Sequence, residues 1–308
     1  MKKFLSKLLL FLLLLGVMVW LVARCDNADR NSNSDHNVLK IGHMSAFDSL
    51  NILFVGNSYC YSSIYSPLFD SMNRRTFNLG IATSGPRFYK LLLDDYLHSA
   101  KKQPDTIMLL LSPTTFSTQA DNWKDYPIHR YLKHPISNEK LTWEFGMVKD
   151  YPAMVFNSVR KGLNNLFDLK NRTYEKELNK IFLYKGLFID STITSDSLEK
   201  AIRHLFVPLR KDHFDHEGAA CLLKLTERMQ ALGMKVLFFE TPTFHLSNYF
   251  SNEFMIAYED YMKKMSGKYV VIRATEMDDR FFRNIDHNNT QGAYHYTRYL
   301  IEQLYGKH

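Results

Sequence analysis

The sequence predicts an α/β fold in which a parallel sheet of about five strands is covered by helices on both faces, a doubly wound arrangement. Two observations predict it. Short runs of apolar residues, each the length of one strand, alternate along the chain with longer segments of helical spacing, which is the pattern of strands buried on both faces and joined by helices. The chain has 308 residues, of which 45% are hydrophobic, enough for a large core.

The first half of this sheet comes from three apolar runs. We expect strands at 51–55, 76–81 and 106–111, with helices at 65–74 and 87–100 between them. The third run is apolar without alternation, so that strand is expected to be covered on both faces.

The last third of the chain repeats the alternation. Gly233 marks the end of the first of its helices, because glycine often follows the last helical turn. We expect helices at 217–232, 253–265 and 291–305, and strands at 235–239 and 269–272.

Residues 117–215 interrupt the alternation. Val155, Val159, Leu163 and Leu166 share one helical face, and further helical pieces are expected near 178–187 and 198–206. We interpret 117–215 as a mostly helical insertion above the carboxyl ends of the strands, where α/β sheets bind ligands. It would act as a lid or as a platform for a partner.

Residues 212–217, with the sequence Asp-His-Phe-Asp-His-Glu, are rich in potential metal ligands. They directly precede an expected helix, where acidic residues suit the helix dipole. We therefore predict an acidic first turn and no metal site.

Residues 1–24 predict an uncleaved signal anchor. Lys2, Lys3 and Lys7 precede an uncharged run at 8–23, close to the roughly 20 apolar residues that cross a bilayer. The basic flank places the N-terminus in the cytoplasm and the body outside the cell membrane. The alternatives are a cleaved signal peptide and a lipoprotein modified at Cys25. Both require a small residue before the cleavage site, where this chain has Arg24. Residues 25–38 would be a polar tether, and 39–308 the folded domain.

The formal charge of +7 is compatible with nucleic acid, an anionic membrane or an acidic glycan as a partner. Basic residues occur in isolated pairs and form no patch in the sequence. We therefore expect no nucleic-acid partner.

Two segments supply the candidate catalytic residues. Ser58, in Gly56-Asn57-Ser58, directly follows the first strand, where a tight turn would expose it; a plain helix N-cap is the alternative. His287 lies between the last strand and the last helix. Because the carboxyl ends of parallel strands meet at one edge of the sheet, we expect Ser58 and His287 to be neighbours.

These residues resemble the SGNH (GDSL-type) hydrolase superfamily. Gly56-Asn57-Ser58 is similar to its first block, Gly-Asp-Ser, and 282–293 is similar to its last block, F-x-D-x-x-H-x-N-x-x-G-A, in register over twelve positions. The resemblance implies a flavodoxin-like fold, no cofactor, Ser58 as nucleophile and His287 as base.

The middle blocks of that superfamily resemble 78–85 and 104–115. The resemblance implies oxyanion donors at Gly85 or Gly80, of which Gly85 lies farther into the loop, and at Thr114. Thr114 replaces the asparagine of the family, and the loss of one oxyanion donor typically costs ~10²–10³ in rate.

The last block also departs from the family. Asn284 replaces the aspartate that orients the histidine, a change that costs roughly 10⁴ in a serine protease. Asn284 through its amide oxygen and the nearby Asp286 are two alternative supports for His287.

Asn57, Glu240 and His245 are expected to contact substrate.

Residues 111–116 are similar to the S-P-x-x-F segment of membrane-anchored SGNH-like proteins of teichoic acid D-alanylation, which share their layout with proteins of alginate O-acetylation. The resemblance implies a cell-envelope glycan as substrate, a membrane-bound O-acyltransferase as partner, and an acyl-serine from which an acetyl-like group is transferred or removed. The rival hypothesis is a non-catalytic SGNH-like scaffold that partners the acyltransferase.

Overall fold

The computed structural model describes most of the predicted domain. The described residues are 6–7, 9–14, 16–17, 20, 35–47, 49–118, 120, 132, 172–187, 213–243, 250–283 and 287–306. Among them, no helix combines the length and the apolar character needed to span a membrane. The predicted anchor at 1–24 lies largely outside these residues.

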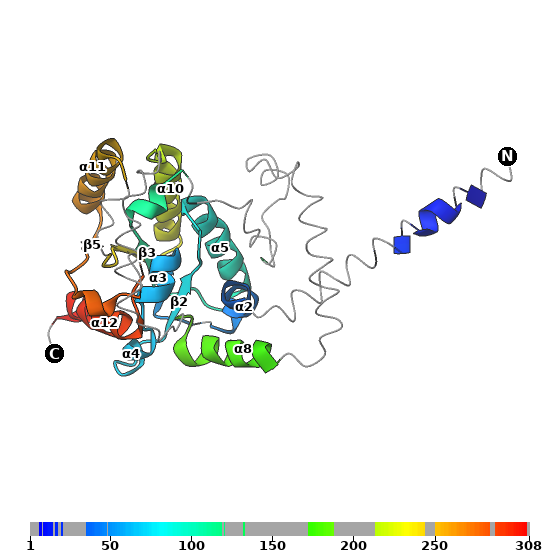
Figure 1. Ribbon diagram of the computed structural model, residues 1–308, viewed down its shortest axis with the longest axis horizontal. Helices are drawn as coiled ribbons and strands as arrows, with labels where there is room; N and C mark the ends of the chain where they lie inside the picture. Colours follow the sequence, from blue (N-terminus) through cyan, green and yellow to red (C-terminus); the bar gives the residue numbers. More distant parts are fainter. Residues whose placement is uncertain are drawn as a thin grey trace.

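The sheet has five parallel strands in the order β2-β1-β3-β4-β5 (Figure 1). The α/β class and all five expected strands are therefore confirmed, with bounds that differ by at most two residues. The strands are β1 (Ile52–Gly56), β2 (Thr76–Gly80), β3 (Thr106–Leu110), β4 (Lys235–Phe239) and β5 (Val271–Ile272).

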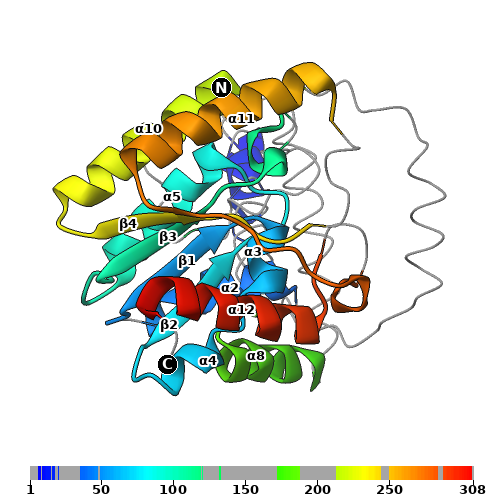
Figure 2. The same ribbon diagram turned by 90° about the vertical axis from the view of Figure 1, so that its left-hand side faces the viewer.

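Helices cover both faces of this sheet (Figure 2). The strand order reverses direction after β2, so right-handed crossovers put the helices before and after that reversal on opposite faces. One face carries α3 (Ser58–Ser63), α4 (Pro67–Asp70) and α12 (Thr290–Tyr305). The other carries α5 (Pro86–Ser99), α10 (His216–Ala231) and α11 (Asn252–Lys268).

The predicted helix at 65–74 is wrong at both ends, because only Pro67–Asp70 is α-helical. Asn73 adopts a left-handed conformation with φ of 55°, which asparagine tolerates better than most residues. The N–H of Arg74 then returns to the carbonyl of Phe69, so the chain turns into β2 within a few residues.

A helix overlaps the last residues of the predicted tether at 25–38. Helix α2 (His36–His43) begins after Asp35, whose side chain accepts hydrogen bonds from two N–H groups of the first turn. Val38 and Ile41 are buried. Residues 36–38 thus belong to a helix that packs on the domain, because this short amphipathic helix has an apolar face to bury.

Within the described residues of the insertion lies helix α8 (Arg172–Tyr184), which overlaps the helical piece expected at 178–187. It packs against α2 (Figure 1), and the carbonyl of Lys185 accepts a hydrogen bond from the N–H of Asn78 in β2. This segment therefore covers the edge strand of the sheet, which would otherwise offer unpaired backbone groups. The helical segments expected at 155–166 and 198–206 lie outside the described residues, so the position of the insertion above the strand ends stays a prediction.

Candidate active site

The turn after β1 positions Ser58. A Cβ atom on Gly56 would lie 2.5 Å from Cβ of Cys60 and 2.7 Å from Cβ of Leu110, so only glycine lets α3 start this close to β3. Asn57 caps α3, because its Oδ1 accepts a hydrogen bond from the N–H of Tyr59. Ser58 is the first residue of the helix and is half-buried.

Asn57 also joins the turns that follow β1 and β3. Its Nδ2 donates to Oγ1 of Thr114 at 3.2 Å, and Thr114 lies in the short 3₁₀-helix η2 (Pro113–Phe116). The hydroxyls of Thr114 and Ser112 are 2.8 Å apart. The structure thus brings two predicted site residues, Asn57 and Thr114, together. Both polar atoms of the Asn57 side chain are hydrogen-bonded to groups of the protein.

Hydrogen bonds around His287 fix the path of its segment. The N–H of Arg283 donates to the carbonyl of His287 at 2.8 Å, and Asn289 caps α12 by accepting from the N–H of Gly292. A Cβ on Gly292 would lie 2.1 Å from the carbonyl oxygen of Phe281. The glycine therefore allows α12 to start against the chain that leads to His287.

The segments that carry Ser58 and His287 meet at α3. The His287 ring stacks on the ring of Tyr59, the residue after Ser58, with centroids 5.2 Å apart and planes inclined by 15°. It also lies edge-on to Tyr61 at 6.3 Å. Asn288 donates to Oγ of Ser63 at 3.2 Å, a second link to the same helix. Asn284 and Asp286 lie outside the described residues.

The two candidate oxyanion glycines have different surroundings. Gly80 ends β2, its N–H donates to Oδ1 of Asn78 at 3.0 Å, and its carbonyl accepts from Nζ of Lys40 at 2.6 Å. Gly85 precedes α5 as its N-cap. The loop before Gly85 is tied to the end of β1, because the N–H of Ile81 donates to the carbonyl of Gly56 at 2.8 Å.

Lys40 is a charged residue that the sequence interpretation missed. It is fully buried, and its Nζ lies 5.3 Å from the ring centroid of Tyr61. Burial lowers the pKa of Lys40 to about 7 and raises the pKa of the neighbouring Cys60 thiol to about 12. No sequence feature marks Lys40, since one lysine on a short amphipathic helix usually faces solvent.

Glu240, predicted to contact substrate, is held by other residues of the protein. Its carboxylate accepts from the Tyr258 hydroxyl at 2.8 Å and pairs with Arg273 at 2.8 Å, and its backbone carbonyl accepts from the Tyr296 hydroxyl. Burial raises the pKa of the Glu240 carboxyl. Glu240 therefore joins β4 to α11 and α12. His245 lies outside the described residues.

The acidic turn predicted before α10 is present in its described part. Asp215 caps α10 by accepting from the N–H of Gly218, and it pairs with Arg87 of α5. Within the described ranges, no three His, Cys, Asp or Glu side chains are grouped as metal ligands would be.

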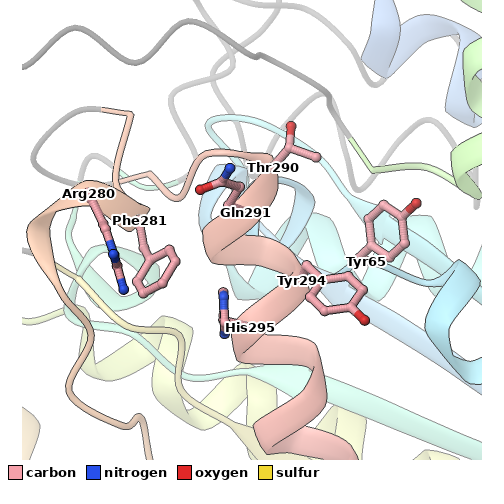
Figure 3. Close-up of a pocket in the computed structure, with 7 residues that line it drawn as sticks. All are labelled: Tyr65, Arg280, Phe281, Thr290, Gln291, Tyr294 and His295. Atoms are coloured by element: carbon pink, nitrogen blue, oxygen red, sulfur yellow. The ribbon is translucent and has the colours of Figure 1, made fainter.

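A pocket of about 530 Å³ lies beside the His287 segment, at the start of α12 (Figure 3). Residues on both sides of His287 in the sequence contribute to it. Its lining comprises Tyr65, Arg280, Phe281, Thr290, Gln291, Tyr294 and His295.

No family model matches this chain, and no curated protein is similar to it. Among solved structures, the chain matches a protein of Streptococcus pneumonia whose name refers to a platelet activating factor. The match has a TM-score of 0.22 and 16% identity, and it covers 83% of this chain and 97% of the other. At this level the similarity carries no argument about function.

Proposed function

We propose that this chain is a membrane-anchored, extracytoplasmic SGNH-like enzyme that transfers or removes an acetyl-like acyl group on a cell-envelope glycan. The observation that carries the proposal is the stacking of His287 on Tyr59, the residue that follows Ser58. Two segments from opposite ends of the folded domain meet there, as a nucleophile and its base must.

In the first half-reaction, Oγ of Ser58 attacks the ester carbonyl carbon and its proton passes to the imidazole of His287. The carbonyl oxygen becomes an oxyanion. When the tetrahedral intermediate collapses, the ester C–O bond breaks, His287 returns the proton to the leaving alkoxide, and the acyl group remains on Ser58. A sugar hydroxyl or water then attacks the acyl-serine by the reverse sequence, giving transfer or hydrolysis.

Three groups are proposed to stabilise the oxyanion. The N–H of Ser58, at the first position of α3, has no acceptor inside its own helix. Gly85 is favoured over Gly80 because it lies farther into the loop that follows β2. The hydroxyl of Thr114 accepts from Asn57, which leaves its own hydrogen for Ser112 or for the oxyanion.

The His287 ring needs an orienting partner to act as a base. We assign this role to Asn284 or Asp286, the two alternatives that the sequence supplies. Stacking on Tyr59 restrains the ring plane, so the orienting group has only to select the tautomer.

A fluorophosphonate probe tests for an activated serine. The full-length chain, kept in detergent because of its apolar segment at 8–23, is treated with the probe and analysed by mass spectrometry. We expect labelling at Ser58 that is lost in Ser58→Ala and strongly reduced in His287→Ala. Ser62→Ala is the matched control, since Ser62 lies one turn further along the same helix. Equal labelling of Ser58→Ala and the wild type would refute the proposed nucleophile.

The direction of the reaction is tested in cells. Mass spectrometry compares the envelope glycans of a wild-type strain, a Ser58→Ala strain and a deletion strain. Fewer acyl groups in the Ser58→Ala strain indicate transfer, and more indicate hydrolysis. Acylation that changes only in the deletion strain would favour the non-catalytic scaffold.

A further inference from the structure

The pocket beside His287 is lined by a connected row of rings. Tyr65 and Tyr294 lie edge to face at 5.9 Å, Tyr294 and His295 are 6.1 Å apart, and His295 and Phe281 are 4.3 Å apart. Tyr294 remains 41% exposed, so its ring is accessible to a ligand.

Polar groups stand at the edges of this row (Figure 3). Gln291 and Thr290 project from the first turn of α12, and the Arg280 guanidinium lies 4.9 Å from the ring centroid of Phe281. Burial and the nearby Tyr184 and Tyr294 raise the pKa of Tyr65, so its hydroxyl stays neutral and can donate or accept. An accessible ring with hydrogen-bonding groups around it, as at Tyr294, suits a ligand that has apolar faces and hydroxyl edges.

The charge near the pocket is balanced. Arg280 is paired with Asp278 at 3.7 Å. Over 278–283, two aspartates offset Arg280 and Arg283. A strongly anionic ligand would gain little from such a surface, because attraction to its charge requires an excess of positive groups.

The pocket and His287 are held by the same stretch of chain. Asn289, two residues after His287, donates through Nδ2 to the carbonyl of Arg280 at 2.6 Å, and its N–H donates to the carbonyl of Phe281 at 3.0 Å. On the other side, the N–H of Tyr65 donates to Oγ1 of Thr297 in α12. A ligand in the pocket would therefore lie in a fixed position next to the segment of His287.

We infer that this pocket is a saccharide subsite that binds an uncharged sugar unit of the glycan on the exposed ring of Tyr294, between Tyr65 and His295. The inference rests on the proposed function for its role, since it assigns the unit that carries or receives the acyl group. The volume of about 530 Å³ lies within the ~300–1,000 Å³ of small-molecule sites. A sugar ring offers C–H faces to the aromatic rings and hydroxyls to Gln291, Thr290 and Arg280.

Binding is measured on a glycan array that carries uncharged and uronate-containing oligosaccharides, and the best ligand is then titrated by calorimetry. We expect the full-length wild type and Ser58→Ala to bind an uncharged oligosaccharide with the same affinity. Tyr294→Ala should weaken binding at least tenfold. Gln291→Ala, a change at an exposed position that leaves the rings intact, should weaken it severalfold. Arg298→Ala, one turn beyond Tyr294 on α12, is the matched control and should bind as the wild type does.

The subsite is refuted if no uncharged oligosaccharide binds, if only uronate-containing ones bind, or if Tyr294→Ala and Gln291→Ala bind as well as the wild type. Labelling by the fluorophosphonate separates this outcome from failure of the proposed function. Loss of sugar binding with Ser58 still labelled rejects the subsite alone. Sugar binding by a chain whose Ser58 is never labelled rejects the catalytic proposal and keeps the subsite.

Discussion

His287 stacks face to face on Tyr59, with ring centroids 5.2 Å apart, although the two residues come from opposite ends of the folded domain. Tyr59 is itself buried, with 4% of its surface exposed. The position of the imidazole is therefore set by α3, the helix that also begins with Ser58. Substitutions in α3 that remove this contact should therefore change the position of the His287 ring.

Replacing Tyr59 tests this coupling. Tyr59→Ala removes the ring that supports His287, and we expect the rate of fluorophosphonate labelling at Ser58 to fall by about 10²-fold, the effect of a small misplacement of a catalytic group. Tyr59→Phe keeps the ring and should label at close to the wild-type rate. Circular dichroism checks that both variants are folded. Unchanged labelling in folded Tyr59→Ala would show that the ring does not position the histidine.

Gly292 and Gly267 form a matched pair of helical glycines. A Cβ on Gly292 would lie 2.1 Å from a backbone oxygen, whereas a Cβ on Gly267 in α11 would meet no atom within 4 Å. We expect Gly292→Ala to lower the free energy of unfolding by about 1–3 kcal/mol through overpacking. Gly267→Ala should raise it by roughly 0.5–1 kcal/mol, because alanine loses less backbone entropy in a helix. Urea denaturation measures both, and equal effects would contradict the close approach at Gly292.

Lys40 makes stability depend on pH in a defined direction. Burial lowers its pKa from the ordinary 10.5 to about 7 in the folded protein. Between these values the unfolded chain binds a proton that the folded chain lacks, so this group makes the free energy of unfolding rise as pH rises from about 7 to about 10.5. The slope from one proton is at most ~1.4 kcal/mol per pH unit.

The comparison of Lys40→Met with the wild type isolates that contribution. Denaturant unfolding is followed from pH 6 to pH 10, and we expect the stability of Lys40→Met relative to the wild type to fall as pH rises above about 7. The groups near Lys40 are His36 on its own helix and Cys60 and Tyr61 on α3; burial lowers the pKa of His36 to about 3 and raises that of Cys60 to about 12. Lys224→Met, at an exposed position of α10, controls for loss of a lysine. A constant difference across this range would argue against a buried amine.

Asn57 is expected to contribute to stability in two ways. Asn57→Ala removes the cap of α3, worth ~1 kcal/mol, and the hydrogen bond to Thr114, worth a further ~1 kcal/mol. Asn57→Asp keeps the capping oxygen and loses only the donor to Thr114, so it should cost about half as much. Thermal and urea unfolding compare the two. If both variants lose the same stability, the hydrogen bond between Asn57 and Thr114 does not contribute to the free energy of unfolding.

The strands were predictable because their signal is local. In β1 and β3, runs of apolar side chains lie between turn residues, and a parallel strand covered on both faces needs little more. The predicted helix at 65–74 was too long because the apolar spacing continued past Asn73. The left-handed conformation of Asn73 depends on the turn into β2. Helix α2 was not predicted, because its apolar face is short and the polar residues before it indicated a tether.

The candidate site was predictable in part. Thr114 was selected through the resemblance to the SGNH superfamily. The order of elements implied that the carboxyl ends of the strands lie at one edge of the sheet, which is why Ser58 and His287 were expected to be neighbours. Glu240 was selected by the same argument, yet its carboxylate is held by Tyr258 and Arg273. A position at a strand end does not reveal which partners a side chain finds inside the protein.

By itself, the sequence determined the α/β class, the five strands and the segment that bears each candidate catalytic residue, because these follow from apolar spacing and chain order. Only the tertiary structure decided that His287 rests on Tyr59, that Lys40 is buried against Gly80, and that α8 covers the edge of β2. These contacts join residues far apart in the chain. Their energies depend on how whole elements pack together, and no local pattern of side chains encodes that.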